Sequence, residues 1–215
     1  MKPSGIDSHS PHIYGWGTKL VKPTPLGGIV STIYTLTIEP MTKESFAPFG
    51  ELWNPDERPS ERRIISRTDF EVDGQTTVGV IWQPYETLSF NELERHFGVS
   101  QSFVQLSGPP SIVCAAPATD SDDPFDVPNP SDVRAFLIDS NSGWCFKRGV
   151  WHSLNRHVLA PPGATYIIIN SKPNPTQVVN YETSTGYLSR DLGGDKTPRT
   201  LDYKGRFGGV FQISL

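Results

Sequence analysis

Alternating apolar and polar residues recur along the chain at the two-residue period of a half-buried strand. Tyr34, Leu36 and Ile38 alternate with threonines, which predicts a strand with one face toward a core. Short apolar runs rich in β-branched and aromatic residues predict further strands at 77–82, 102–106, 111–116, 133–138, 144–152 and 165–170. Turn residues separate these runs about every eight to twelve positions, which is typical of a β-sandwich or barrel.

Helices are expected to be few and short. Thr42 is a good N-cap for a helix that ends at Phe46, just before Pro48. The segment Ser89-Phe90-Asn91-Glu92 matches a capping box and predicts one helical turn. Gly149 lies within the predicted strand 144–152, where we expect it to cause a kink.

Composition divides the chain into three parts. Residues 1–30 are rich in Gly, Pro and Ser and predict an N-terminal arm. Residues 31–172 contain the predicted strands and are expected to form the barrel. Residues 173–215 are more polar and predict an extension that packs on the barrel or on a dimer partner.

Charge and cysteine content narrow the classes of function. The net charge is −4 and the pI is about 5.7, which argues against a basic nucleic-acid surface. Two cysteines are too few to indicate a secreted disulfide framework. The first residues lack a signal-peptide pattern, and no apolar stretch is long enough to span a membrane. We therefore expect a cytoplasmic protein that binds neither nucleic acid nor membrane.

Two short segments contain the candidate chemistry. In the first, Glu94 and His96 are two residues apart, followed by Gln101 and, after six more residues, Gly108. Residues i and i+2 of a strand point to the same face, so Glu94 and His96 are expected to face the barrel interior together. In the second segment, His152 follows Gly149 on a later strand. We expect Glu94, His96 and His152 to form the catalytic group.

The same side chains suit a metal ion. Two imidazoles and one carboxylate can bind one divalent transition metal, with Gln101 as a weak fourth ligand. Alternatively, Glu94 and Arg95 form a solvated charge pair, and His96 is a surface or hydrogen-bonded histidine without a ligand role. The spacing favours a common site over these alternatives.

Neighbouring residues are candidates for substrate binding. Strand alternation lets only one of Lys147 and Arg148 face inward, where it would hold a substrate carboxylate; alternatively, both lie solvated at the rim. Cys145 shares the alternation phase of Lys147 and is expected to face inward with it. Trp151, next to His152, is expected to form a wall of the pocket, and Gln101 completes the predicted substrate contacts.

Both segments resemble the two half-motifs of cupins, small jelly-roll barrels that hold their site inside. Over residues 34–172 the chain is similar to the ureidoglycolate lyase family, also called ureidoglycolate hydrolase. The resemblance is carried by segments 45–50, 92–96, 100–104, 133–137 and 148–152, with Leu-Glu-Arg-His and Arg-x-x-Trp-His as the most specific combinations. It implies an all-β cupin fold, a double-stranded β-helix with a few short helices and both terminal extensions.

The resemblance also implies an activity. Members of the family release urea from ureidoglycolate to give glyoxylate in purine and allantoin breakdown, and are usually homodimers. Such an enzyme is a carbon–nitrogen lyase of the amidine-lyase type that takes a small carboxylate and needs no organic cofactor. This chain departs from the family pattern at Cys145, Phe146, Lys147 and Ser153. Two alternatives therefore remain: a diverged cupin enzyme acting on another small hydroxy or keto acid in a biosynthetic pathway, and a non-catalytic binding barrel.

Overall fold

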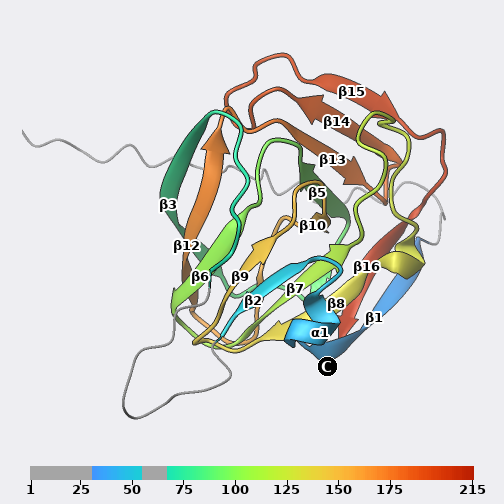
Figure 1. Cartoon of the computed structure of the whole chain (residues 1–215). Helices are drawn as coiled ribbons and strands as arrows, with labels where there is room; N and C mark the ends of the chain where they lie inside the picture. The colour runs from blue at the N-terminus through green and yellow to red at the C-terminus, as the bar shows by residue number, and fades with distance from the viewer. Residues whose placement is uncertain (1–30, 55–66) are drawn as a thin grey trace, which may run out of the picture. The chain divides into compact units, whose positions relative to one another are not determined.

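Two β-sheets make up the part of the chain that the computed structural model describes, residues 31–54 and 67–215 (Figure 1). The larger sheet has eleven strands and the smaller has five. The helix α1 (Lys43–Phe46) has four residues, and no helix in the described ranges is long and apolar enough to cross a membrane. The predicted N-terminal arm, residues 1–30, lies outside these ranges.

The smaller sheet is antiparallel throughout. Its strands follow the order β2 (Gly50–Trp53), β9 (Gly143–Phe146), β6 (Ser102–Ser107), β12 (Gly163–Lys172) and β3 (Gln75–Pro84). The ten-residue pairing of β12 with β3 is the longest in this sheet. β12 is thus hydrogen-bonded on both edges, to β3 and to β6.

The larger sheet includes strands from both ends of the described chain. Its order is β15 (Arg199–Asp202), β14 (Thr185–Ser189), β13 (Thr176–Asn180), β5 (Glu92–His96), β10 (Trp151–Ser153), β7 (Ser111–Ala116), β8 (Arg134–Ile138), β1 (Thr32–Pro40), β16 (Gly209–Ser214) and β4 (Ser89–Phe90), with β11 (His157–Val158) paired to β7. A 3₁₀ turn at Pro130–Asp132 precedes β8. β1 pairs in parallel with β8 and with β16. The residues after 172 therefore contribute four strands to the same sheet.

Two hydrophobic cores lie on opposite faces of the larger sheet. The inner core joins β7 and β8 to the smaller sheet and is rich in aromatic residues: Phe46, Phe49, Phe103, Phe136, Trp144, Phe146 and Tyr166. The outer core packs residues of the C-terminal strands, such as Tyr181 and Phe211, against Leu93 and Trp151. Because strand residues alternate between faces, neighbouring residues on β5 and β10 enter different cores.

The all-β jelly-roll prediction is confirmed, and α1 begins after Thr42, whose side chain accepts a hydrogen bond from the Ser45 amide. The helical turn predicted at 89–92 is wrong. Ser89 and Phe90 instead form β4, because Phe90 pairs with Phe211 and stacks on its ring at 4.8 Å. Tertiary pairing outweighs the capping signal there.

The continuous strand predicted at 144–152 is also wrong. Its first half is β9 of the smaller sheet, and its second half is β10 of the larger one. Gly149 has a φ of 77° and sits in the turn that crosses between the sheets. Only glycine adopts this backbone conformation readily. The alternation of inward and outward side chains nevertheless keeps its phase, because Phe146 and Val150 both lie in the inner core and Trp151 lies in the outer one.

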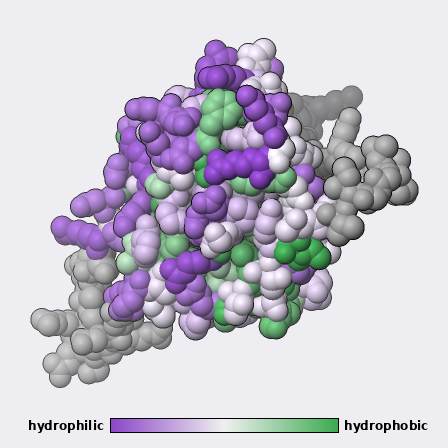
Figure 2. All heavy atoms as spheres, turned by 90° about the vertical axis from the view of Figure 1, so that its right-hand side faces the viewer, coloured by the Kyte–Doolittle hydropathy of each residue, from purple (hydrophilic) through white to green (hydrophobic). Residues whose placement is uncertain are grey.

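One face of the smaller sheet exposes apolar side chains. On β3, Val78, Val80 and Trp82 are 71%, 69% and 58% exposed, because they alternate with residues that face the inner core. β3 lies on the left of Figure 1, whereas Figure 2 shows the right-hand side. That side is largely hydrophilic, with apolar residues in small separate groups. The exposed apolar row is thus confined to one edge of the fold.

Candidate active site inside the barrel

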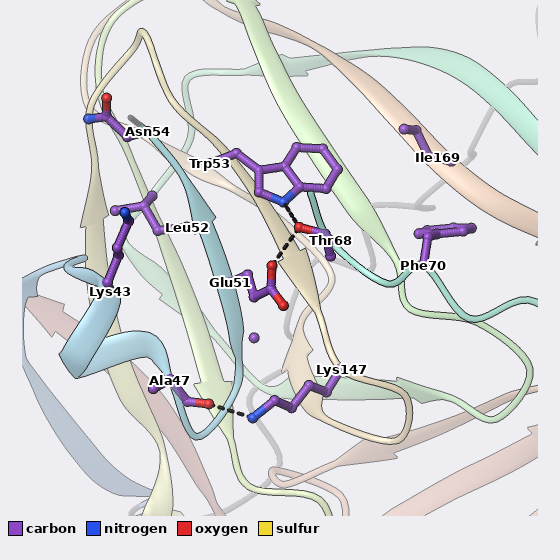
Figure 3. A pocket seen from close by; sticks show the side chains of 11 residues that line it. Lys43, Ala47, Glu51, Leu52, Trp53, Asn54, Thr68, Phe70, Lys147 and Ile169 are labelled. Atoms are coloured by element: carbon purple, nitrogen blue, oxygen red, sulfur yellow. Dashed lines mark hydrogen bonds between the residues drawn. The ribbon is translucent and has the colours of Figure 1, made fainter. Parts of the chain in front are cut away.

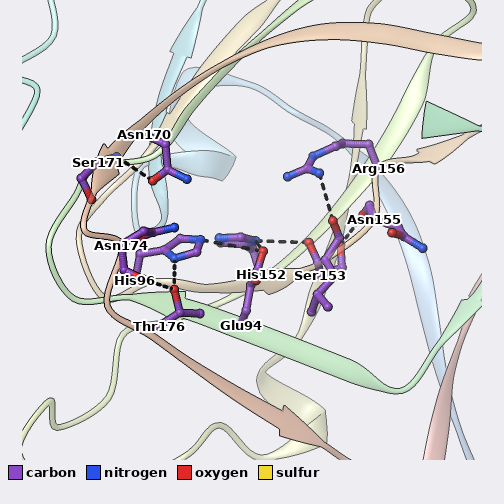
Figure 4. Close-up of polar contacts among 11 residues, drawn as sticks. Glu94, His96, His152, Ser153, Asn155, Arg156, Asn170, Ser171, Asn174 and Thr176 are labelled. Atoms are coloured by element: carbon purple, nitrogen blue, oxygen red, sulfur yellow. Dashed lines mark hydrogen bonds and ion pairs between the residues drawn. The ribbon is translucent and has the colours of Figure 1, made fainter. Parts of the chain in front are cut away.

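β5 and β10 place three potential ligand side chains side by side on the inner face of the larger sheet (Figure 4). Glu94 and His96 share this face of β5, and His152 on β10 is the register partner of Glu94. One ligand atom from each of the three residues lies within 4.8 Å of the others. We call Glu94, His96 and His152 the inner cluster. The sequence prediction that these residues meet inside the barrel agrees with this arrangement.

Hydrogen bonds fix the tautomer of both histidines. The Thr176 hydroxyl donates to the Asn174 carbonyl at 3.0 Å, so its oxygen accepts from Nδ1 of His96 at 2.9 Å. Nδ1 of His152 donates to the Ser153 carbonyl at 3.2 Å, because a carbonyl oxygen can only accept. Nε2 of each histidine is then an acceptor, and neither has a hydrogen-bond partner.

Burial controls the charge of the inner cluster. Loss of solvation raises the pKa of Glu94 to about 7, opposed by the positive charge of Arg156. Burial, with a smaller contribution from Arg156, lowers the pKa of His96 to about 3. The pKa of His152 also falls well below its usual value because of burial and the neighbouring His96. Both histidines are therefore neutral near pH 7 and keep free Nε2 lone pairs.

Amide side chains extend the cluster. Burial is the main influence on the pKa of His96, and Gln101, buried just before β6, and Asn174 act to raise it. Oε1 of Gln101 and Oδ1 of Asn174 lack close donors of their own. Buried polar atoms are rarely left without partners. A group of acceptors without donors is the arrangement that a cation satisfies.

The residues present therefore fit a divalent transition metal. Imidazole nitrogen and carboxylate oxygen are ligands that such metals accept, and the set of two histidines and one carboxylate is a common one. Metal-binding histidines usually donate their other ring nitrogen to a carbonyl, hydroxyl or carboxylate. His96 and His152 both do so through Nδ1.

Sequence reasoning missed Arg156, which lies in the segment between β10 and β11. Its charge acts on the pKa of Glu94, His96 and His152, so it shares the barrel interior with the inner cluster. One signal was available in the sequence. Arg156 is the only Lys, Arg, Asp or Glu between Arg148 and Lys172.

Lys147 and Arg148, the predicted carboxylate ligands, are engaged elsewhere. Nζ of Lys147 donates to the Ala47 carbonyl at 2.6 Å, beside an open pocket where Glu51 accepts a hydrogen bond from Thr68 (Figure 3). Arg148 binds Asp73 through both terminal nitrogens, at 2.8 and 3.1 Å. Neither side chain is brought to the inner cluster.

Trp151 does not form a wall beside His152, contrary to the sequence prediction. It alternates with His152 on β10 and packs in the outer core. Cys145 also faces away from the inner core, because Trp144 and Phe146 occupy the inward positions of β9. Phe146 instead stacks on the His152 ring at 4.5 Å. Neighbours on one strand face opposite sides, so an inward His152 places Trp151 outward, and inward Trp144 and Phe146 place Cys145 outward.

Three of the four departures from the family pattern thus lie off the inner face. Cys145 and Lys147 point away from the inner core, and the Ser153 hydroxyl donates to the Asn155 carbonyl and accepts from the Cys114 amide. Phe146 is the one such position in contact with the inner cluster. These changes leave Glu94, His96 and His152 in place.

Arg95 is not part of a solvated charge pair. Its side chain is fully buried and donates to the Gln177 side chain and to oxygens of Thr119 and Asp120. The guanidinium also lies 4.7 Å from the Trp151 ring centre. Arg95 therefore has a structural position on the outer face, whereas its neighbours Glu94 and His96 face inward.

A family model and the similar proteins of known sequence carry the same description. The family model described as "Ureidoglycolate lyase" matches residues 33–187. The ureidoglycolate lyase of Pseudomonas fluorescens is 34% identical over 141 residues, which cover 55% of this chain and 74% of the relative. That of Pseudomonas paraeruginosa is 37% identical over 131 residues, which cover 55% of this chain and 73% of the relative. That of Rhodobacter capsulatus is 34% identical over 140 residues, 60% of this chain and 80% of the relative.

A solved structure of RmlC from Streptococcus suis in complex with dTDP-D-xylose is also similar, at 11% identity. The match covers 65% of this chain and 60% of that one, with a TM-score of 0.29. A likeness this weak carries no argument about the fold or a ligand. The family model, by contrast, matches residues 33–187, which include both segments of the inner cluster. This chain belongs to the ureidoglycolate lyase family.

Proposed function

We propose that this protein is a ureidoglycolate lyase that cleaves the carbinolamine C–N bond of ureidoglycolate to give glyoxylate and urea. The observation that carries the proposal is the inner cluster, which lies within the residues that the family model matches. The reaction is an elimination of the amidine-lyase type and requires no redox step. Purine breakdown through allantoin is the route in which such a substrate arises.

The reaction moves one proton in total. The hydroxyl oxygen of the substrate loses its proton and becomes the aldehyde oxygen of glyoxylate. The electrons of the C–N bond go to nitrogen, which gains a proton and leaves as urea. A group that accepts the first proton and returns it to nitrogen therefore completes the balance.

Glu94 is the residue that we assign to this proton transfer. Its carboxylate belongs to the inner cluster, and its two oxygens allow one to bind a cation while the other accepts a proton. His152 is the alternative acceptor through Nε2 when it is not a metal ligand. His96, held by Thr176, orients the cluster.

We propose that Glu94, His96 and His152 hold one divalent transition metal, with Gln101 as a fourth ligand. When bound, such an ion polarises a substrate oxygen and favours its deprotonated form. Metal analysis of the purified protein tests this proposal. Stoichiometric metal in the wild type and its loss from a His96→Ala variant support the assignment, whereas metal-free protein with full activity contradicts it.

We also propose that the protein is a cytoplasmic homodimer. The exposed row of Val78, Val80 and Trp82 supports association, since contiguous exposed apolar residues often mark contact surfaces. Both Cys114 and Cys145 are free thiols, which fits a reducing compartment.

The decisive assay follows glyoxylate and urea released from ureidoglycolate by the purified protein. Equal amounts of both products, formed faster than the spontaneous decay of the substrate, are the expected result. No acceleration by metal-supplemented protein would reject the lyase assignment. Small 2-hydroxy and 2-keto acids assayed in parallel test the diverged-enzyme alternative.

One observation favours a non-catalytic binding barrel as a second candidate. Trp144 is fully buried in the inner core and stacks on Phe103 at 5.2 Å, so part of the barrel interior is filled. Trp144 stands on β9 of the smaller sheet, however, and the inner cluster is on the larger one. Ligand binding without product formation would select this second candidate.

A further inference from the structure

Two arginines are buried in the described part of the chain, and their surroundings differ. Arg95 is saturated by hydrogen bonds to side-chain and backbone oxygens on the outer face. Arg156 is 5% exposed and donates from Nη1 to the Leu154 carbonyl at 2.9 Å. Its Nε has no hydrogen-bond partner. Of these two buried arginines, Arg156 is therefore the one with an N–H donor, Nε, that no protein acceptor uses.

No carboxylate of the described residues forms an ion pair with Arg156. Its guanidinium carbon lies 3.8 Å from the centre of the Phe103 ring, which holds the cation by its aromatic face. Buried charges are normally paired, because an unpaired one is costly. An arginine kept in this position, with hydrogen-bonding capacity to spare, is suited to an anion that arrives as a ligand.

The guanidinium faces the interior that the inner cluster occupies. Figure 4 shows it turned toward the side of Asn170, above the ring of His152. Its electrostatic effect reaches Glu94, His96 and His152 alike. The cation and the acceptor group therefore stand on two sides of one interior region.

We propose that Arg156 binds the carboxylate of the substrate and so makes the site selective for small 2-hydroxy carboxylates. The planar guanidinium matches a carboxylate in two parallel hydrogen bonds. A 2-hydroxy carboxylate carries its hydroxyl on the adjacent carbon, where the acceptors of the inner cluster meet it. This inference rests on the proposed function for the identity of the substrate, and it replaces Lys147 and Arg148 as carboxylate ligands.

Binding without turnover tests the inference. Calorimetric titration with glycolate and with its uncharged amide, glycolamide, compares ligands that differ only in the carboxylate. We expect wild-type protein to prefer glycolate, and Arg156→Gln to bind it about 10- to 100-fold more weakly, the loss typical of a charge-assisted hydrogen-bonded contact. Lys147→Gln is the matched control and should bind glycolate as the wild type does.

Stability separates a ligand-binding role from a structural one. Because ligand-free Arg156 is a buried, unpaired cation, Arg156→Gln should melt at or above the wild-type temperature. A structural arginine would lower it. Arg156→Lys keeps the charge but lacks the planar guanidinium, so we expect its affinity for glycolate to be intermediate. This variant also tests the inference if Arg156→Gln does not fold.

Several outcomes overturn the inference. They are equal wild-type affinity for glycolate and glycolamide, unchanged binding by Arg156→Gln, or a loss of binding by Lys147→Gln instead. The lyase assay is independent of these results. Glycolate binding through Arg156 without glyoxylate release would reject the lyase assignment and support the anion site. Turnover of ureidoglycolate by Arg156→Gln with an unchanged Michaelis constant would support the lyase assignment and reject the anion site.

Discussion

His152 is the direct register partner of Glu94 across the antiparallel pair of β10 and β5. Backbone hydrogen bonds between two central strands therefore fix the separation of two residues that lie far apart in the sequence. β5 is held on its other edge by β13, where Val178 is the partner of Glu94. Sites built on paired strands keep their geometry better than sites on loops. The inner cluster is thus a rigid part of the fold.

Glu94→Gln should reduce glyoxylate release by at least about 100-fold, the scale of a lost acid–base group. Glutamine keeps the size of the side chain but cannot accept and return a proton. The measurement is the initial rate of product formation at saturating ureidoglycolate. Thermal unfolding of the same preparation checks that the fold is retained.

Glu92→Gln provides the matched control on the same strand. The Glu92 side chain accepts a hydrogen bond from Asn180 at 3.1 Å and is not part of the inner cluster. Its variant should retain activity within a few-fold of the wild type. Equal losses in both variants would show that strand β5, and not the Glu94 carboxylate, is what the activity requires.

Arg95→Met should destabilise the protein by about 3–5 kcal/mol, the cost of breaking a buried charged network. The change leaves Oε1 of Gln177 without the two donors it now receives at 3.0 and 2.7 Å. Chemical denaturation followed by fluorescence measures the free energy of unfolding. Because Arg95 faces the outer core, the folded fraction should keep normal turnover.

The control for this change is Arg134→Met. Arg134 pairs with Glu39 at 2.6 Å, but both side chains are about one-third exposed. Exposed ion pairs contribute about 1 kcal/mol or less. A larger loss for Arg134→Met than for Arg95→Met would refute the ranking of the two networks.

His157 should make stability depend on pH below neutrality. Burial lowers its pKa to about 4, opposed by a hydrogen bond with the Thr87 backbone, whereas an unfolded histidine has a pKa of about 6.5. The unfolded chain then binds more protons between these values, so stability is complete above about pH 6.5 and falls as pH drops toward 4. At about 1.36 kcal/mol per pKa unit, the loss from this residue approaches 3 kcal/mol.

His157→Gln removes this titration without adding a charge. Unfolding free energies measured from pH 7.5 to 4 should fall less steeply for the variant than for the wild type. Other groups titrate in the same range, so the difference between the two curves is the quantity of interest. Parallel curves would mean that His157 has the same pKa in the folded and unfolded states.

The sequence was sufficient to place the inner cluster because each strand carries a local signal, and because the resemblance to the two cupin half-motifs brings the two strands together. The i, i+2 spacing of Glu94 and His96 fixes a common face wherever the strand is placed. The spacing of Gly149 and His152 marks the second strand. Most strands were predicted for the same reason, since alternation and turn residues are visible over a few positions.

The sequence was not sufficient where the fold depends on distant pairing. Lys147 was expected on one continuous strand with His152, although the chain changes sheets at Gly149 and Lys147 bonds to the Ala47 carbonyl instead. Residues 176–214 lack a strong periodic signal, and of their strands β13 forms by pairing with β5 and β16 by pairing with β1. Arg156 escaped notice because its burial comes from Phe103 and the opposite sheet, not from its neighbours in sequence.

Val80→Lys should convert the proposed dimer to monomer. Val80 is at the centre of the exposed apolar row of β3, and in a two-fold symmetric interface a patch meets its own copy. A charge at this position would be buried near its symmetry mate, which disfavours association by several kcal/mol. Ile33→Lys is the control, because Ile33 is 64% exposed on β1, away from β3. Sedimentation velocity at equal protein concentrations should show a dimer for the wild type and for Ile33→Lys, but a monomer for Val80→Lys. A monomeric wild type would exclude the dimer, and a dimeric Val80→Lys would place its contact surface elsewhere.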